Sequence, residues 1–338
     1  MTLLSVLLIT LPLTFRGKLQ NDSSNPFDTA RRYDSLSMPD SALMWLEKVD
    51  LKRLDTSRLV QFYLLKGSVL RQLNFTDRAW QVYDSVKNLI SSYSNSQAFE
   101  AEMIFLKGRL LNDRASYTDA LICFESAQKM IMQKSPVDTS LLIRVLNFTG
   151  ISHFYLGDFS AALNTYYAAN QLASEKQSVN LLDYADIIQN IAITYSQLSQ
   201  FDSAYIYINR SRALKESALR KDDPVLISFY VNYGRFLQMT GRITESMIYF
   251  NRADSLLRGR SGQEFIAGSL HINIGNTFQL TGDYDRAIQY FQSAYGYLSQ
   301  SQGPSHPSTM SALNNIAFMY NRIGQHDSAI AILNRLRE

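Results

Sequence analysis

The chain has 338 residues, with 33 basic and 30 acidic side chains and a formal net charge of +3. This small excess, without a clustered basic stripe, argues against a nucleic-acid-binding surface. A hydrophobic fraction of 46% excludes global disorder, and 15 Gly with 7 Pro are too few turn residues for an all-β protein. One Cys excludes a disulfide framework and a Cys-rich zinc site, and the four His show no metal-ligand spacing.

The amino terminus begins with an apolar run, LLSVLLITLPLTF, from Leu3 to Phe15. This run is shorter than the ~20 residues that a membrane-spanning helix needs, but it suits the core of a signal peptide. We therefore predict a signal peptide or apolar leader over residues 1–19, a polar linker over residues 20–26, and an exported or periplasmic protein. Because no Lys or Arg precedes the run, a cytoplasmic protein with an uncleaved leader is the alternative.

One sequence motif recurs eight times between residues 27 and 338. Each copy starts at a small residue, the first small position, and four copies have Gly seven residues later, at the turn position. A second small position follows twelve residues after the first, and a bulky position follows after sixteen. The first small positions are Ala30, Gly67, Gly108, Gly150, Ala192, Gly234, Gly275 and Ala317, at intervals of 37 to 42 residues. Nine of the 15 glycines occupy the first small or the turn position, so the repeat is not a coincidence of composition.

The seventh copy shows which local structure the motif predicts. The pattern around Gly275 is helical, and the sequence TGD at 281–283 interrupts it. Gly282 can adopt the left-handed conformation that ends a helix, and Asp283 can cap the helix that follows. Each copy is therefore expected to form two antiparallel helices.

The same copy indicates how these helices pack. We expect Gly275 and Ala287 to be small because the two helices of one repeat cross closely there. Phe278 and Phe291 are expected to fill the space between neighbouring repeats. Since one helix pair cannot bury its apolar face alone, the pairs must stack into an extended array.

This motif resembles the tetratricopeptide repeat (TPR) family, which has a small residue, an aromatic residue, Gly, Ala and a bulky residue at the same relative spacing. The resemblance covers residues 27–338 and implies an all-α, right-handed solenoid of eight helix-turn-helix repeats. The period differs, because most copies here have 41 or 42 residues and the usual repeat has about 34. Long repeats with a link such as GPSHPST, from Gly303 to Thr309, resemble kinesin-light-chain-type repeats. In bacterial proteins, repeat arrays of this type often precede a CHAT-type peptidase, a sensor kinase or a transcription regulator, so the resemblance implies such a context as one alternative.

No constellation of residues indicates catalysis or metal binding. His153 falls at the aromatic position of repeat four, where a core or groove-edge role is expected, and Cys123 is expected to be a small buried side chain. His271 and His326 are expected near helix starts and exposed, and His306 is expected in a turn. The basic residues Arg210, Arg212, Lys215, Arg220 and Lys221 are expected on a solvated face. We therefore predict a protein that is not an enzyme and that needs no cofactor.

An asparagine recurs two residues before the first small position in repeats five to eight. Since the first helix of each repeat lines the concave surface of a TPR solenoid, these amides are expected to form one column. An Asn side chain both donates and accepts, so each can hold one peptide bond of an extended ligand. The alternative is that each Asn bonds a neighbouring repeat and sets the stacking angle. The proposed groove residues are Asn190, Asn232, Arg235, Asn273, Asn276 and Asn315.

These features predict a scaffold that binds a protein or extended peptide in its concave groove, without nucleic acid or a small-molecule cofactor. The alternative is the sensor or regulatory part of a longer enzyme, whose output domain would lie beyond residue 338. The last helix, HDSAIAILNRLRE over residues 326–338, carries more apolar surface than one packed face needs. We therefore expect a fused domain or a partner to cover repeat eight.

Overall fold

The computed structural model describes residues 25–35, 38–91, 97–175, 180–260 and 262–335. Within these ranges the protein has sixteen α-helices, one short 3-10 helix at Leu51–Arg53 (η2) and no β-strand. The predicted leader over residues 1–19 lies outside the described residues. The predicted linker over 20–26 lies mostly outside them as well, and its last residue, Pro26, already belongs to the first helix.

The helices form eight consecutive pairs, as the repeat predicts, and the two helices of a pair are called A and B. The A helices are α1 (Pro26–Ser35), α3 (Thr56–Gln72), α5 (Gln97–Asp113), α7 (Thr139–Tyr155), α9 (Leu181–Gln197), α11 (Val225–Met239), α13 (Glu264–Leu280) and α15 (Pro307–Arg322). The B helices are α2 (Pro39–Leu46), α4 (Thr76–Ser91), α6 (Tyr117–Met132), α8 (Phe159–Glu175), α10 (Phe201–Ala218), α12 (Ile243–Leu257), α14 (Tyr284–Gln302) and α16 (His326–Arg335).

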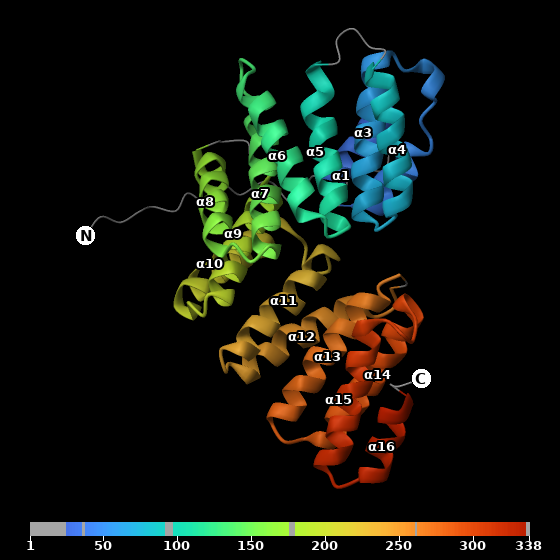
Figure 1. Ribbon diagram of the computed structural model, residues 1–338, viewed down its shortest axis with the longest axis vertical. Coiled ribbons are helices and arrows are strands. Elements are labelled where there is room, and N and C mark those ends of the chain that lie inside the picture. The colour runs from blue at the N-terminus through green and yellow to red at the C-terminus, as the bar shows by residue number, and fades with distance from the viewer. Residues whose placement is uncertain (1–24, 36–37, 92–96, 176–179, 261, 336–338) are drawn as a thin grey trace, which may run out of the picture. The chain divides into compact units, whose positions relative to one another are not determined.

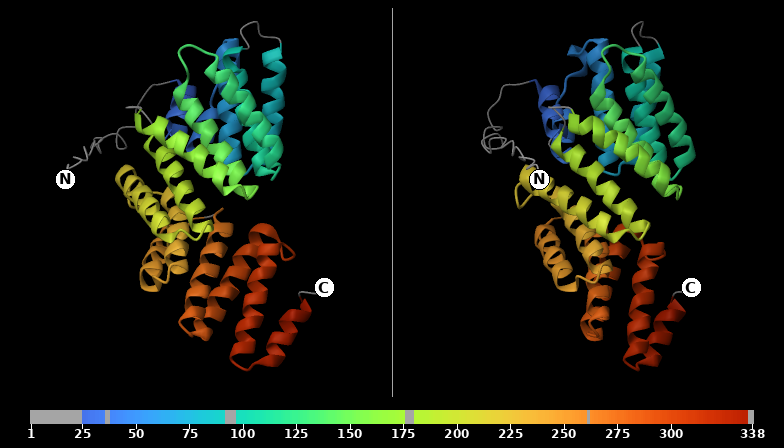
Figure 2. Two further views of the ribbon diagram at one scale, coloured as in Figure 1. Left: turned by 60° about the vertical axis from the view of Figure 1, so that its left-hand side comes forward. Right: turned by 90° about the vertical axis from the view of Figure 1, so that its left-hand side faces the viewer.

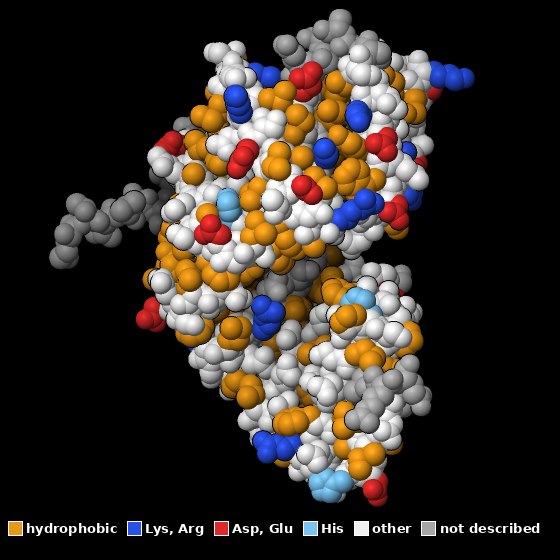
Figure 3. Space-filling model, viewed as in Figure 1, with side chains coloured by type: hydrophobic (Ala, Val, Ile, Leu, Met, Phe, Trp, Pro, Cys, Tyr) orange, Lys and Arg blue, Asp and Glu red, His pale blue; other side chains and the backbone are white. Residues whose placement is uncertain are grey.

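The chain divides into two compact units. The first ends at Pro136 and contains α1–α6, and the second begins at Val137 and contains α7–α16. Within each unit, successive helix pairs lie side by side (Figures 1 and 2). On the face drawn in Figure 3, basic and acidic side chains are interspersed among apolar ones in both units. The repeat motif keeps its phase through the boundary, so the sequence alone did not predict this division.

The turn between A and B has the same backbone geometry in every repeat where it is described. The turn position has a left-handed φ at Asn74, Ala115, Gly157, Ser199, Gly241, Gly282 and Gly324, with φ from 58° to 81°. The residue after it donates its backbone N–H to a carbonyl five residues earlier, as Asp283 does to Phe278 at 2.9 Å. The Asp283 side chain then accepts a bond from the Arg286 backbone N–H at 3.1 Å, which confirms the predicted cap. The left-handed turn is therefore imposed by the fold and not by glycine alone.

In four repeats, the bulky position packs directly against the first small position of its own repeat. A methyl group on Gly275 would lie 2.6 Å from Cε1 of Phe291, and one on Gly150 would lie 2.4 Å from Cε1 of Tyr166. Gly108 and Gly234 meet the rings of their own bulky residues in the same way. Phe291 also belongs to one core cluster with Leu313, Ile316 and Met319 of α15, so its ring fills space toward the next repeat, as predicted, as well as the space above Gly275.

The residue types at the first small position and at the bulky position vary together from repeat to repeat. Where the bulky position is aromatic, the first small position is Gly: Gly67 with Tyr83, Gly108 with Phe124, Gly150 with Tyr166, Gly234 with Phe250 and Gly275 with Phe291. Where the bulky position is aliphatic, the first small position is Ala: Ala30 with Leu46, Ala192 with Ile208 and Ala317 with Leu333. Over Gly108, Gly150, Gly234 and Gly275, a planar ring therefore occupies the volume that a methyl group would take. Gly67 is the exception, because the side chains nearest to it are those of Leu106 and Val82 and not that of Tyr83. We expect this exchange to keep the spacing between helices A and B similar from repeat to repeat.

Candidate functional site

The four asparagines of the predicted column lie on the A helices of repeats five to eight, all within the second unit. Asn190 is on α9, Asn232 on α11, Asn273 on α13 and Asn315 on α15. Asn232 is exposed, and the other three are half-buried. The positions three residues later, Arg235 and Asn276 among them, lie on the same helical face. Helical geometry therefore gives each A helix one short polar stripe.

The first member of the column makes a structural contact. The Asn190 Nδ2 donates to Oδ1 of Asn147 on α7 at 2.9 Å. This bond joins repeats four and five, as the alternative interpretation of the column expected. Sequence analysis missed Asn147 because it lies one residue out of phase with the column, three residues before Gly150 instead of two.

The remaining members behave differently. Within the described ranges, the side-chain amides of Asn232, Asn273, Asn276 and Asn315 make no hydrogen bond to the protein. The contact between α11 and α13 is made instead by Gln238, which donates through Nε2 to the Asn273 backbone carbonyl at 3.1 Å and to Thr277 Oγ1 at 2.8 Å. These four amides are therefore not needed to hold neighbouring repeats together.

Two of the predicted residues share a small pocket on the A-helix face. Asn232 and Arg235 of α11 line a pocket of about 40 Å³ together with Ile193 of α9. Ala192, Ser196, Gln197, Ile208, Phe236 and Met239 complete its lining. Neither Asn276 nor Asn315 belongs to it. The pocket has room for about one small apolar group or a water molecule.

Apolar side chains continue the same stripes toward the carboxyl ends of the A helices. Met239 lies seven residues after Asn232, and Leu280 lies seven residues after Asn273. Phe318 lies three residues after Asn315. All three are exposed large hydrophobic side chains, between 47% and 63% accessible. The face thus combines free amides, one cation at Arg235 and apolar groups at helical spacing.

One predicted solvated residue is buried instead. Lys215 of α10 is 5% exposed. Its Nζ lies 2.6 Å from Oδ1 of Asp186 and 2.8 Å from Oε1 of Gln189, both on α9, and 5.1 Å from the centre of the Phe229 ring. These contacts compensate the burial of the ammonium group. Asp186 is therefore engaged within the protein, although its position on the A-helix face made it a neighbour of the predicted groove.

The histidines and the cysteine give no catalytic arrangement. The prediction that His271 is exposed near a helix start is wrong, because α13 begins at Glu264 and places His271 in its third turn. Its side chain is 14% exposed, with Nδ1 2.9 Å from Ser293 Oγ and Nε2 3.6 Å from Asp254 Oδ1. Burial lowers the pKa of His271, and the Asp254 carboxylate opposes that shift.

Cys123 and His306 are placed as predicted. Cys123 is buried, and burial raises the pKa of its thiol, which keeps it protonated and unreactive at neutral pH. His306 caps α15 and accepts a hydrogen bond from the Ser308 backbone N–H at 3.2 Å. Among the described residues, no group of three or more His, Cys, Asp and Glu side chains could hold a metal ion. In the same part of the chain, no helix is both long and apolar enough to span a bilayer.

Comparisons with known proteins agree with the repeat and the fold. Residues 265–338, which include all but the first residue of α13 and the whole of α14 to α16, match the sequence profile of the tetratricopeptide repeat family. No curated protein matches the sequence. The helical array resembles TPR-like repeat proteins of known structure, including repeats of the kinesin light chain type.

Three solved structures illustrate the likeness. A Rap protein complexed with competence and sporulation factor has a TM-score of 0.66 and 12% identity, over 95% of this chain and 88% of that one. NprR in complex with its cognate peptide NprX has a TM-score of 0.60 and 13% identity, over 94% and 89% of the two chains. A Podospora anserina putative kinesin light chain with nearly identical TPR-like repeats has a TM-score of 0.50 and 16% identity, over 58% and 93%. At these identities the likeness shows the fold.

Proposed function

We propose that the protein is a non-enzymatic scaffold that binds an extended peptide along the A-helix face of repeats five to eight. The observation that carries this proposal is the set of amides at Asn232, Asn273 and Asn315. They are exposed or half-buried on successive A helices, and they make no hydrogen bond within the described part of the protein. An unpaired amide can accept from the N–H and donate to the C=O of a peptide.

Similar folds support a peptide ligand. NprR, whose fold this chain shares at a TM-score of 0.60, was solved with its cognate peptide. The Rap protein with a TM-score of 0.66 was solved with competence and sporulation factor. Both are solved complexes of a fold that spans nearly this whole chain.

The side chains beside the amides indicate which peptide the face would accept. Arg235 is exposed and has no ion pair within the described residues, so it can receive an acidic side chain or a carboxylate. Met239, Leu280 and Phe318 are exposed on the same stripes and can cover apolar side chains. The ligand that fits best is therefore extended, partly apolar and acidic at one point.

The test is a selection of ligands from a displayed peptide library, followed by affinity measurements on variants of the full chain. The double substitution Asn232→Ala, Asn273→Ala should weaken the selected peptides at least tenfold. Each lost hydrogen bond contributes about 0.5–1.5 kcal/mol, and about 1.4 kcal/mol corresponds to a factor of ten. The melting temperature should stay unchanged, because these amides have no hydrogen-bond partner among the described residues.

Two control variants separate binding from folding. Asn164→Ala changes an exposed asparagine on α8, a B helix, and should change neither affinity nor stability. Asn190→Ala breaks the bond to Asn147 and should lower stability by about 1 kcal/mol. A folded Asn232→Ala, Asn273→Ala protein that keeps full affinity for every selected peptide would show that the amides are not the binding site.

Three further expectations are part of the proposal. Export rests on the apolar run from Leu3 to Phe15, and a mature protein that begins after it outside the cytoplasm would support export.

A role as the regulatory part of a longer enzyme remains the alternative, which the genomic sequence after residue 338 tests. A partner or fused domain covering repeat eight is supported by Ile330 and Leu333 on α16, which are 55% and 42% exposed. If that surface self-associates, Leu333→Glu should abolish the association without unfolding the protein.

A further inference from the structure

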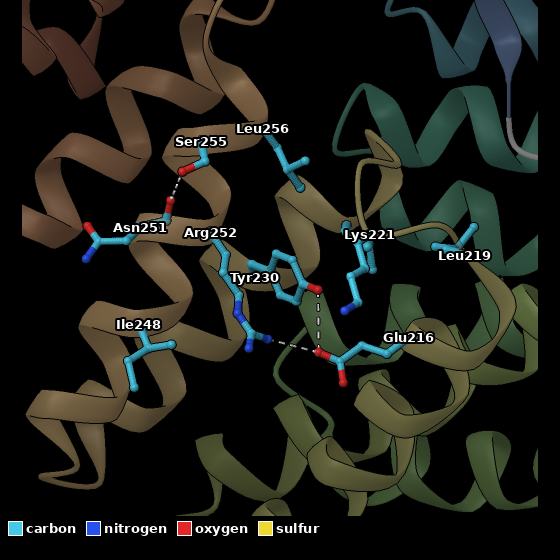
Figure 4. A pocket seen from close by; sticks show the side chains of 10 residues that line it. Glu216, Leu219, Lys221, Tyr230, Ile248, Asn251, Arg252, Ser255 and Leu256 are labelled. Carbon is cyan, nitrogen blue, oxygen red and sulfur yellow. Dashed lines mark hydrogen bonds and ion pairs between the residues drawn. The ribbon is translucent and has the colours of Figure 1, made fainter.

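A hollow of the second unit lies away from the peptide face, between the B helices of repeats five and six. It has a volume of about 520 Å³ and is lined by α10, the link that follows it, α11 and α12. Figure 4 shows that side chains from all four segments converge on it. A volume of this size falls in the range of about 300–1,000 Å³ that is usual for small-molecule sites.

One side of the pocket is polar and carries excess positive charge. Glu216 of α10 accepts from Tyr230 Oη at 3.4 Å, and its carboxylate pairs with Arg252 Nη1 at 3.3 Å and with Arg212 Nη1 at 3.0 Å. Glu216 is therefore already neutralised by two guanidinium groups. Lys221 adds a further cation from the link.

Lys221 is free to bind a ligand. Its side chain is exposed, its ammonium group makes no ion pair with any described residue, and in Figure 4 it points toward the Glu216 carboxylate and the Tyr230 hydroxyl. The lining holds two cations, Lys221 and Arg252, against the one carboxylate of Glu216, which Arg212 also pairs from outside the lining. An anionic group of a ligand is therefore favoured at this end.

The other side of the pocket is apolar. Leu219, Leu226 and Tyr230 are nearly fully buried and form its inner wall. Leu256 is half-buried, and Ile248 is 50% exposed at the rim. An exposed Ile beside a buried apolar wall leaves apolar surface that a ligand can cover.

We propose that this pocket binds a small amphiphilic anion, with its carboxylate or phosphate beside Lys221 and Arg252 and its apolar body against Leu226, Ile248 and Leu256. The size of the pocket favours a whole small molecule over a single inserted protein side chain. The lining comes from α10, α11 and α12 and includes none of the groove asparagines. The site is therefore separate from the proposed peptide face, and either one can fail without the other.

The test uses the full chain and three defined probes: decanoate, decyl phosphate and the uncharged decanol, each kept below its micellar concentration. Calorimetry should show saturable binding of one decanoate or one decyl phosphate per chain, and binding of decanol at least tenfold weaker. Whichever of the two anions binds more tightly identifies the preferred headgroup. In methyl-labelled protein, the Ile248 signal, assigned with Ile248→Leu, should shift on binding.

Variants then locate the site. Lys221→Met should weaken the preferred anion at least fivefold and leave decanol unchanged, whereas Lys221→Arg should restore most of the affinity. Asn251→Trp, at an exposed position of the lining on α12, should fill the pocket and block both anions. Lys129→Met on α6 removes an equally exposed cation elsewhere and is the matched control.

Specific results would overturn the proposal. These are non-saturable binding of both anions, equal affinity for decanol, an unshifted Ile248 methyl signal, or full anion affinity in the folded Lys221→Met and Asn251→Trp proteins. All five variants, Ile248→Leu included, change exposed or rim residues, so their melting temperatures should match that of the unmodified chain.

Discussion

Replacing Gly275 by Ala tests whether the pairing of glycine with an aromatic ring sets the spacing of helices A and B. The added methyl carbon would lie 2.6, 2.8 and 3.0 Å from three carbons of the Phe291 ring. Since carbon atoms pack best at about 3.5–4.0 Å, the ring would have to retreat by about 1 Å. Phe291 has no exposed surface and is enclosed on all sides, so it cannot move freely.

The expected magnitude follows from two opposing effects. Overpacking in a core costs about 1–3 kcal/mol, whereas Gly to Ala within a helix gains up to about 1 kcal/mol. Gly296→Ala isolates the gain, because Gly296 lies on the exposed side of α14 and a methyl group there meets no atom within 4 Å. Gly296→Ala should therefore stabilise the protein, and Gly275→Ala should be less stable than Gly296→Ala by about 1–3 kcal/mol.

A double-mutant cycle supplies the decisive measurement. Phe291→Leu alone leaves a cavity over Gly275 and should cost about 1–2 kcal/mol. Combined with Gly275→Ala it recreates the buried natural pair Ala30 with Leu46, so the double variant should be more stable than the two single effects predict, by about 1–3 kcal/mol. Urea unfolding followed by circular dichroism, with hydrogen exchange of α13 and α14, gives the values. Strict additivity, or a Gly275→Ala protein as stable as Gly296→Ala, would refute the reasoning.

The other predictions concern the turns, the buried lysine and pH. Ala115→Gly and Ser199→Gly should each stabilise the protein by about 0.5–1 kcal/mol in thermal unfolding, because both residues hold a left-handed φ that costs a side chain energy; a loss of stability would contradict this. Asp186→Ala should destabilise more than Lys215→Met, by about 1–2 kcal/mol in urea unfolding, because it leaves a buried ammonium group without its carboxylate; the opposite order would show that the pair is not the reason for the burial. Burial, opposed by Asp254, lowers the pKa of His271 in the folded state, so the unfolded state binds more protons and the free energy of unfolding should fall as the pH drops below about 6.5. In His271→Gln, the free energy of unfolding should no longer fall for this reason below about pH 6.5. Above that pH, the variant and the unmodified chain should show the same pH dependence, and melting curves between pH 5 and pH 8 would reveal both effects.

The repeat made most of the fold predictable. Small residues at fixed spacing identified the helix pairs, and Gly282 followed by Asp283 identified the turn and the cap, because these features depend on residues close together in the sequence. Ala115 and Ser199 hold the same left-handed turn, although neither residue type indicates it. There the packing of the two helices decides the backbone conformation, and a local signal cannot report that.

The candidate site was less predictable because its contacts are long-range. Asn190 and Asn232 occupy equivalent positions in the sequence, yet within the described part of the chain only Asn190 has a side-chain partner, Asn147 in the preceding repeat. Lys215 stands among other basic residues, and its burial depends on Asp186 and Gln189, which lie on another helix. The pocket beside Lys221 has no motif at all, since its lining is brought together by the way α10, α11 and α12 meet.

In each repeat, the first small position and the bulky position form a matched pair, either Gly with an aromatic ring or Ala with an aliphatic side chain. This matching also limits where segments of two repeats can be joined to make a new array. Each matched pair is contained in one repeat, so a crossover in a link between repeats, such as 303–306, moves both members together. A crossover in the turn between helices A and B separates them. Joining α9 to α14 would place Ala192 under the ring of Phe291, and joining α13 to α10 would leave Gly275 facing Ile208 with space unfilled. Gene duplications and designed chimaeras that keep this fold should therefore have their breakpoints between repeats and not inside them.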